Sequence, residues 1–141
     1  MHKVIIIFLT NMSYATYNLV RGKAMSICIE FYSKENGDCP VAEFISKLDK
    51  KMAARVIRSI DLLEQHGNDL RAPYSKAIND GIFELRTQQG SDITRVFYFF
   101  FVGNKAVITN GFVKKTQKTP PSEIARAINY KKDYERRYRY G

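Results

Sequence analysis

Two arginines and a lysine fall on neighbouring segments that have the character of β-strands, and their side chains together suit an anion. Arg86 lies in the first segment, Arg95 in the second and Lys114 at the end of the third. If both intervening turns close symmetrically, Arg86 lies opposite Arg95, and Arg95 lies opposite Phe112. Like charges directly opposite on a sheet are destabilising. Their convergence therefore predicts an anion site, and we expect phosphate because a guanidinium grips two of its oxygens.

The three segments present alternate side chains to the two faces of the expected sheet. They run over Ile82–Thr87, Ile93–Val102 and Ala106–Lys114, with turns near Gly90 and at Gly103-Asn104. In this register Phe97 lies opposite Asn110. The polar face is expected to hold Glu84, Arg86, Arg95, Phe97, Asn110, Phe112 and Lys114. The opposite face, expected to be core, holds Phe83, Leu85, Val96, Tyr98, Phe100, Val107 and Thr109.

A strand and two helices are expected before these segments. Loose alternation predicts the strand over Ile27–Tyr32. Pro40 fits the first turn of the first helix, and Asp49 fits the N-cap of the second. The second helix is expected to stop at His66 and Gly67, where a histidine favours the helix dipole and glycine suits a C-cap. That structural role leaves no strong histidine candidate for acid–base chemistry.

A last helix is expected after a cationic loop that ends in two prolines, with Thr119 or Ser122 as its cap. Tyrosines spaced by four share one stripe of this helix, where packing and base stacking are the alternatives: Tyr130, Tyr134 and Tyr138. The order strand, two helices, three strands and a helix predicts an α+β fold. We expect a small antiparallel-rich sheet with a helical hairpin on one face and the C-terminal helix at an edge.

The charge balance points to an anionic partner. The 141 residues carry a formal net charge of +9, which favours nucleic acid, an acidic protein or a membrane surface. Residues 110–141 hold nine basic and three acidic residues and so supply +6 of this charge. Lys51, Arg55 and Arg58 share one face of the second helix. That face is either solvated or contacts RNA.

The remaining features bound the protein class. Cys28 and Cys39 are the only cysteines, so two reduced thiols are expected and a zinc site is not. Residues 1–24 are interpreted as an appendage that includes a short apolar run, or as the product of an upstream start codon, and residues 25–141 as one domain. No targeting signal is evident, which favours the cytoplasm.

Three elements in this order resemble the phage-derived, HigB-like branch of the RelE toxin superfamily. They are the run Asp80–Arg86 with its Glu-Leu-Arg ending, the aromatic strand with Arg95, and Gly111–Pro120 followed by Glu123, Ile124 and Ala127. The resemblance covers about Met25 to Arg137. It implies a RelE-like fold and a toxin of a type II toxin–antitoxin pair that cleaves mRNA on the ribosome. It also implies a HigA-like helix-turn-helix antitoxin as partner.

The resemblance also carries residue roles. Arg86 and Arg95 match the arginines of the two strands, and Lys114, Lys115 and Lys118 match lysines after the Gly-Phe pair. Many relatives have a histidine where this chain has Asn110, and asparagine does not exchange a proton near neutral pH. The identity of the acid and the base therefore stays open.

RNA cleavage by 2′-hydroxyl attack requires one proton withdrawn, one donated and the phosphate charge stabilised. The arginines suit the stabilising task, and Lys114 or Lys118 suits proton transfer, because neighbouring cations lower a lysine pKa. Glu84 is either a base or the ion-pair partner of Arg86. Phe112 either stacks on a base or closes the core edge. No acidic cluster suited to magnesium is evident in the sequence, so cleavage without a metal or other cofactor is expected.

Three functional classes fit the same face. The first is the mRNA endonuclease just described. The second is a toxin that acts by binding alone, as in the ParE-like gyrase inhibitors that share this fold, because fold does not fix chemistry. The third is a basic module that binds nucleic acid or docks an acidic antitoxin. Lys51, Arg55, Arg58, Lys115 and Phe112 are the candidate RNA contacts in the first class.

Overall fold

The computed structural model describes residues 27–102, 104–116 and 118–139, and the segment 1–24 interpreted as an appendage lies outside them. The expected helices and strands all form. In chain order the elements are β1 (Cys28–Phe31), α3 (Pro40–Ser46), α4 (Lys50–His66), a 3-10 turn η1 (Gly67–Asp69), β2 (Ser75–Ala77), β3 (Phe83–Gln89), β4 (Asp92–Phe101), β5 (Lys105–Val113) and α5 (Pro121–Arg139). Among the described residues, no helix is both long enough and apolar enough to cross a membrane.

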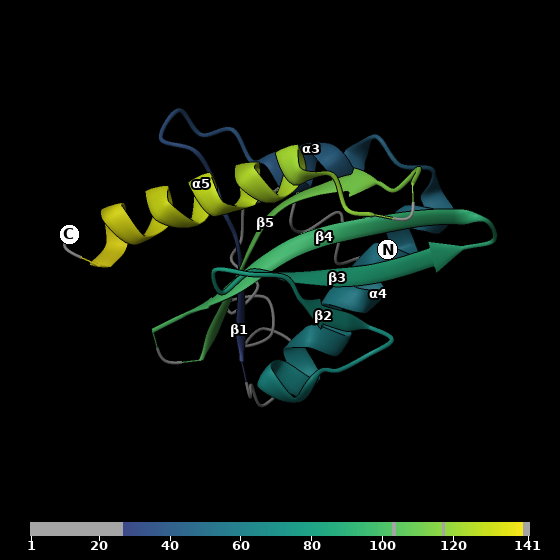
Figure 1. The fold of residues 1–141 in the computed structure, drawn as a ribbon, viewed down its shortest axis with the longest axis horizontal. Helices are drawn as coiled ribbons and strands as arrows, with labels where there is room; N and C mark the ends of the chain where they lie inside the picture. The colour runs from purple at the N-terminus through teal and green to yellow at the C-terminus, as the bar shows by residue number, and fades with distance from the viewer. Residues whose placement is uncertain (1–26, 103, 117, 140–141) are drawn as a thin grey trace.

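The strands form one mixed sheet in the order β1-β5-β4-β3-β2 (Figure 1). β1 pairs with β5 in parallel, and the other three pairings are antiparallel. This confirms the α+β prediction and agrees with a RelE-like fold. The short edge strand β2 was not predicted. Its three residues carry too little alternation to be recognised in the sequence.

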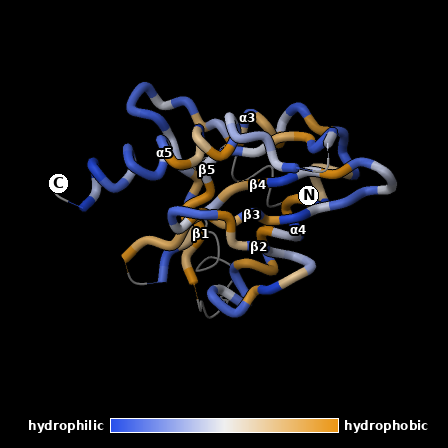
Figure 2. The backbone as a smooth tube through the Cα atoms, in the orientation of Figure 1, coloured by the Kyte–Doolittle hydropathy of each residue, from blue (hydrophilic) through white to orange (hydrophobic). Residues whose placement is uncertain are grey.

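The sheet is covered on both faces. α3 and α4 pack on one face around Leu85, Val96 and Tyr98, and α5 crosses the other (Figure 1). The placement of α5 at an edge was therefore wrong: Ala127 and Tyr134 pack with Phe97 in a second core. The hydrophobic residues follow the strands, whereas α5 is largely hydrophilic (Figure 2). α5 thus contributes one apolar stripe and leaves its other side polar.

Local signals fixed the ends of α4 but not the start of α5. The Asp49 side chain accepts a hydrogen bond from the Met52 backbone N–H at 2.8 Å, which confirms the predicted N-cap. Gly67 ends α4 with a φ of +53°, a backbone conformation that favours glycine. Neither expected cap serves α5, which begins at Pro121 and includes Ser122. The Thr119 hydroxyl instead donates to Glu84.

The pairing between β3 and β4 is the one predicted. Arg86 pairs with Arg95, because the two strands are joined by Gly90 and Ser91 alone. Gly90 has a φ of +62°, which a two-residue hairpin turn of this kind favours.

The predicted pairing of Arg95 with Phe112 between β4 and β5 is confirmed, but it arises in a way that was not predicted. Residues 102–104 join the strands, one more than the expected two-residue turn, so Phe101 pairs with Lys105. A bulge then sets Phe97 against two residues of β5 in place of Asn110 alone. The extra residue in β5 restores the predicted pairing of Arg95 with Phe112.

The bulge also reverses the faces of β5 on its turn-proximal side. Val107 pairs with Phe99 and packs in the second core beneath α5. Its assignment to the face of Leu85 was therefore wrong, and Ala106 and Ile108 occupy that face instead.

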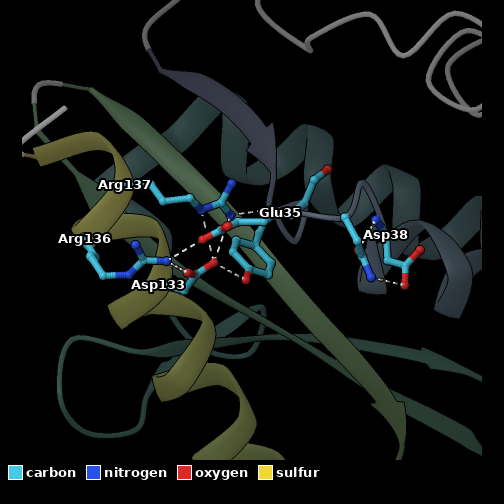
Figure 3. A network of polar contacts seen from close by, with 8 residues as sticks. Glu35, Asp38, Asp133, Arg136 and Arg137 are labelled. Carbon is cyan, nitrogen blue, oxygen red and sulfur yellow. Dashed lines mark hydrogen bonds and ion pairs between the residues drawn. The ribbon is translucent and has the colours of Figure 1, made fainter.

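A polar network fastens α5 to the segment after β1 (Figure 3). The buried Tyr32 hydroxyl donates to Asp133 at 2.6 Å. Arg136 and Arg137 flank the same carboxylate at 2.6 and 2.9 Å. Arg136 also reaches Glu35. The hydrogen bond from Tyr32, together with the two arginines, holds the pKa of Asp133 below its ordinary value of 3.8.

We expect Asp133→Ala to lower the free energy of unfolding by about 1–3 kcal/mol at neutral pH, because it leaves the Tyr32 hydroxyl buried without its acceptor. The Asp133 pKa is lower in the folded state, so its contribution is present above about pH 4 and is lost as pH falls through the folded value. Urea unfolding at several pH values measures the difference from wild type.

Glu35→Ala is the matched control, because Glu35 and its partner Arg136 are 65% and 63% exposed. An exposed pair of this kind contributes about 0–1 kcal/mol. Equal losses for the two variants at neutral pH, or a difference from wild type that grows toward acid pH, would contradict the structural role of Asp133.

Candidate functional site

A buried carboxylate joins the two predicted arginines on the face of the sheet that α5 partly covers. Glu84 Oε2 lies 3.3 Å from Nε of Arg86 and 3.4 Å from Nε of Arg95. The Glu84 side chain is only 2% exposed. The alternation of strand residues places Glu84 and Arg86 on one face, and cross-strand pairing brings Arg95 beside them. Glu84 therefore offsets the repulsion between two guanidiniums that the sheet places directly opposite each other.

The loop before α5 completes the surroundings of this carboxylate. Thr119 Oγ1 donates to Glu84 Oε1 at 2.9 Å. Both carboxylate oxygens thus have a polar partner, which a buried charge requires. Arg95 Nη1 donates in turn to the Thr94 carbonyl at 3.0 Å, which fixes the guanidinium in place. Two guanidiniums against one carboxylate leave one positive charge uncompensated within this group.

The two arginines differ in their access to solvent. The side chain of Arg86 is 30% exposed, whereas that of Arg95 is 8% exposed. Burial lowers the pKa of Arg95, and the adjacent Arg86 lowers it further, whereas Glu84 opposes both effects. Arg86 can therefore contact a ligand directly, whereas the less exposed Arg95 acts mainly through its positive charge.

Lys114 lies close enough to this group for the charges of the group to change its pKa. Burial lowers the pKa of Lys114, and Arg95, Arg86 and Lys76 lower it further, while Glu84 acts in the opposite direction. Its backbone N–H donates to Ile93 at 2.8 Å, which extends the pairing of β5 with β4 by one residue. A lysine with a lowered pKa can take up or release a proton closer to neutral pH than an ordinary one.

A cleft of about 480 Å³ opens at the edge of β3, where its pairing with β2 ends. The cleft joins Arg86 and Arg95 to Arg55 and Arg58 of α4. Its other lining residues are Ser59, Leu62, Pro73, Tyr74, Thr87 and Gln88. α4 packs beside β3 through the hydrogen bond between Ser59 and Thr87 at 2.8 Å. The sequence placed these arginines on two separate surfaces, and the packing of α4 on β3 brings them together.

The other predicted site residues lie outside the cleft. Lys51 is exposed on α4, and Lys115 and Lys118 are exposed on the loop after β5. None of the three lines the cleft. The Thr116 hydroxyl donates to the Lys118 carbonyl at 2.9 Å, a contact that shapes this loop locally.

Phe97, Asn110 and Phe112 of the expected polar face are buried, as Glu84 and Arg95 are. Phe112 is 8% exposed and stacks on Phe97 with ring centroids 5.7 Å apart. Of its two suggested roles, this geometry supports closure of the core. Asn110 is 2% exposed, and its side-chain oxygen accepts from Thr109 at 2.8 Å. Asn110 therefore lies buried in the bulge.

Packing and base stacking were the two suggested roles for the tyrosines of α5, and their contacts support packing. Tyr134 is buried, and Tyr130 stacks on Tyr32 with centroids 4.8 Å apart. Tyr138 lies against Tyr134 at 4.5 Å.

Two residues of the site, Thr119 and Tyr74, were not predicted from the sequence. Thr119 was considered only as a helix cap, and its contact with Glu84 depends on the path of the loop. Tyr74 precedes the unpredicted strand β2 and lines the cleft. Within the described residues, no three His, Cys, Asp or Glu side chains gather in a way that suits a metal ion. Within the described residues, Cys28 and Cys39 form no disulfide bond, and burial raises the pKa of Cys39.

Comparison with known proteins places this arrangement in a family. The profile of the family described as phage-derived protein Gp49-like (DUF891) matches residues 43–132, more than half of the chain. The match includes α4, the three long strands and the larger part of α5. No curated protein matches the chain. The Gp49-like family is a RelE-like toxin family, and its members are commonly toxins of toxin–antitoxin systems. The chain belongs to the phage-derived Gp49-like family.

Proposed function

We propose that this protein is the toxin of a type II toxin–antitoxin system, from the HigB-like branch, and that it cleaves mRNA on the ribosome. A HigA-like helix-turn-helix antitoxin would neutralise it. The single observation that carries the nuclease proposal is the group formed by Glu84, Arg86 and Arg95. It holds two guanidiniums side by side with one uncompensated positive charge, beside a lysine whose pKa is lowered. This combination matches the needs of phosphodiester cleavage.

The reaction assigned to this group is attack of the 2′-oxygen on the adjacent phosphorus, with departure of the 5′-oxygen. The products are a 2′,3′-cyclic phosphate and a 5′-hydroxyl. Arg86 would contact the non-bridging oxygens, and Arg95 would stabilise the growing negative charge from below. Glu84 is assigned the ion-pair role, because both of its oxygens are engaged by neighbouring side chains. Phosphate charge stabilisation thus comes from the chain's own cations, without a metal ion or other cofactor.

The proton transfers fall to the lysines in this proposal. Lys114 is the preferred base for the 2′-hydroxyl, because its pKa is lowered and a base must reach its neutral form to accept a proton. Lys118 is the candidate acid that protonates the 5′-oxygen, and Lys115 a contact to the RNA backbone. Both are exposed on the loop that follows β5. Thr119 fastens the end of this loop to Glu84.

We expect Arg86→Ala to reduce mRNA cleavage in a translating extract by about 10²–10³-fold, because it removes a donor to the reacting phosphate. Its partial exposure makes it the safer arginine to remove. Primer extension on the mRNA measures the cleavage, and circular dichroism checks the fold.

Arg139→Ala is the matched control for this variant, because Arg139 is exposed at the far end of α5. Three results would contradict the proposal. One is wild-type cleavage by Arg86→Ala. Another is intact mRNA with blocked DNA supercoiling, which assigns the protein to gyrase inhibition. The last is growth arrest that persists when Arg86, Arg95 and Lys114 are all replaced, which would indicate a protein that acts only by docking to a partner.

We expect the cleavage rate to rise with pH through the pKa of Lys114, below the ordinary value of 10.5, because the base acts in its neutral form. Lys114→Arg keeps the positive charge but does not deprotonate. It should lose about 10²–10⁴-fold in rate together with this pH-dependent limb. Single-turnover rates over a range of pH provide the measurement.

Lys118→Arg is the companion variant, because it makes the same substitution on the neighbouring loop. Loss of the rising limb in Lys118→Arg, with the limb retained in Lys114→Arg, would transfer the base to Lys118 and contradict the assignment made here.

A further inference from the structure

The cleft at the edge of β3 gathers more positive charge than the reacting phosphate requires. Arg55 and Arg58 come from α4, Arg86 from β3 and Arg95 from β4. None of the residues that line the cleft is an aspartate or a glutamate. Glu84 does not line the cleft, and its single negative charge offsets only one of the two positive charges of the sheet arginines. The side-chain partner of Arg55 is the neutral amide of Gln89. Four guanidiniums around one hollow favour an anionic ligand.

The rim of the same cleft carries an aromatic ring. Tyr74 is 49% exposed, one of the few large apolar side chains that the described part of the chain leaves exposed. Its backbone is held firmly: the Tyr74 carbonyl accepts from the Arg86 N–H at 2.8 Å, and its N–H donates to Arg71 at 3.0 Å. Leu62 and Pro73 provide apolar surface beside it. An aromatic ring on a fixed backbone next to arginines is the arrangement that proteins use to stack a nucleic-acid base.

The cleft and the Glu84 group share two residues. Arg86 and Arg95 line the cleft and also contact Glu84. An RNA strand whose reacting phosphate lies on Arg86 can therefore continue into the cleft, where the next nucleotide meets Tyr74 and the arginines of α4. The cleft volume of about 480 Å³ lies within the range of small-ligand sites.

We propose that this cleft is a nucleotide subsite for the residue adjacent to the scissile phosphate. Tyr74 stacks on its base, and Arg55 and Arg58 contact the flanking phosphate. The inference rests on the proposed function for the position of the reacting phosphate. It adds a stacking residue and a backbone clamp from α4. An acidic protein segment would meet the same arginines but has no need of the Tyr74 ring face.

The test measures binding without cleavage. The probes are a short 2′-O-methyl RNA, which has no 2′-hydroxyl to attack, and an abasic oligonucleotide of the same length and backbone. Fluorescence anisotropy at low salt gives the affinity of the full chain for each. Tyr74→Ala should weaken binding of the methylated RNA at least about fivefold and leave binding of the abasic probe unchanged. Tyr74→Phe should bind both probes as wild type does, because it keeps the ring.

The cation clamp predicts a different pattern. Arg55→Gln with Arg58→Gln should weaken both probes and reduce the salt dependence of binding, by about 0.7 in the log–log slope for each lost contact to a single strand. The matched controls are Tyr138→Ala, because Tyr138 is 53% exposed on α5, and Arg139→Gln. Both controls should bind as wild type does, and thermal melting checks the fold of every variant.

Several outcomes overturn the subsite. They are wild-type affinity in Tyr74→Ala, equal losses on the two probes in Tyr74→Ala, or no binding of the methylated RNA by the wild-type chain at low salt. If a polyglutamate peptide binds and RNA does not displace it at any concentration, the cleft would be assigned to an acidic protein, which would also overturn the subsite. Two further results distinguish the subsite from the proposed function. Binding that depends on Tyr74, with no cleavage on ribosomes, would contradict the nuclease proposal alone. Cleavage that is unchanged in Tyr74→Ala would contradict the subsite alone.

Discussion

The opposition of two like charges across β3 and β4 is the constraint on which the site depends. The register of the sheet places Arg86 directly opposite Arg95, an arrangement that is unfavourable without compensation. Glu84 supplies the compensation from two residues along the same strand, at 3.3 and 3.4 Å. Because one carboxylate cannot neutralise two guanidiniums, the group keeps one positive charge, which a bound phosphate could neutralise. The stability of the sheet and the proposed binding of a phosphate thus depend on the same three side chains.

The rest of the fold determines what this group can reach. α5 covers the neighbouring part of the same face and excludes water from the second core, in which Phe97 and Phe112 are buried. The loop that leads into α5 carries Lys115 and Lys118 and is fastened to Glu84 by Thr119. On the other side, α4 places Arg55 and Arg58 across the edge of β3. The partly exposed Arg86 therefore lies between a lysine-rich loop and an arginine-lined cleft, along the path that we propose for a single strand of RNA.

Features set by local sequence were predictable, and features set by packing were not. Gly90 and Ser91 form the β3–β4 turn, so the predicted pairing of the two arginines followed from a turn that closes symmetrically near Gly90. The bulge at Phe97 could not be predicted, because the alternation of residues does not show where β5 carries an extra residue against β4. The pairing of Arg95 with Phe112 was right only because the longer turn and the bulge offset each other. The cleft was missed because α4 and β3 lie far apart in the sequence and meet only in the folded chain.

A double-mutant cycle between Glu84 and Arg86 measures the central interaction most directly. Urea unfolding of wild type, Glu84→Gln, Arg86→Gln and the double variant gives the four free energies. Glu84→Gln alone should cost about 3 kcal/mol, because it leaves two buried or half-buried guanidiniums facing each other. The double variant should recover at least about 0.5 kcal/mol of the summed losses. Strictly additive losses, or a Glu84→Gln variant as stable as wild type, would show that Glu84 does not hold the arginines together.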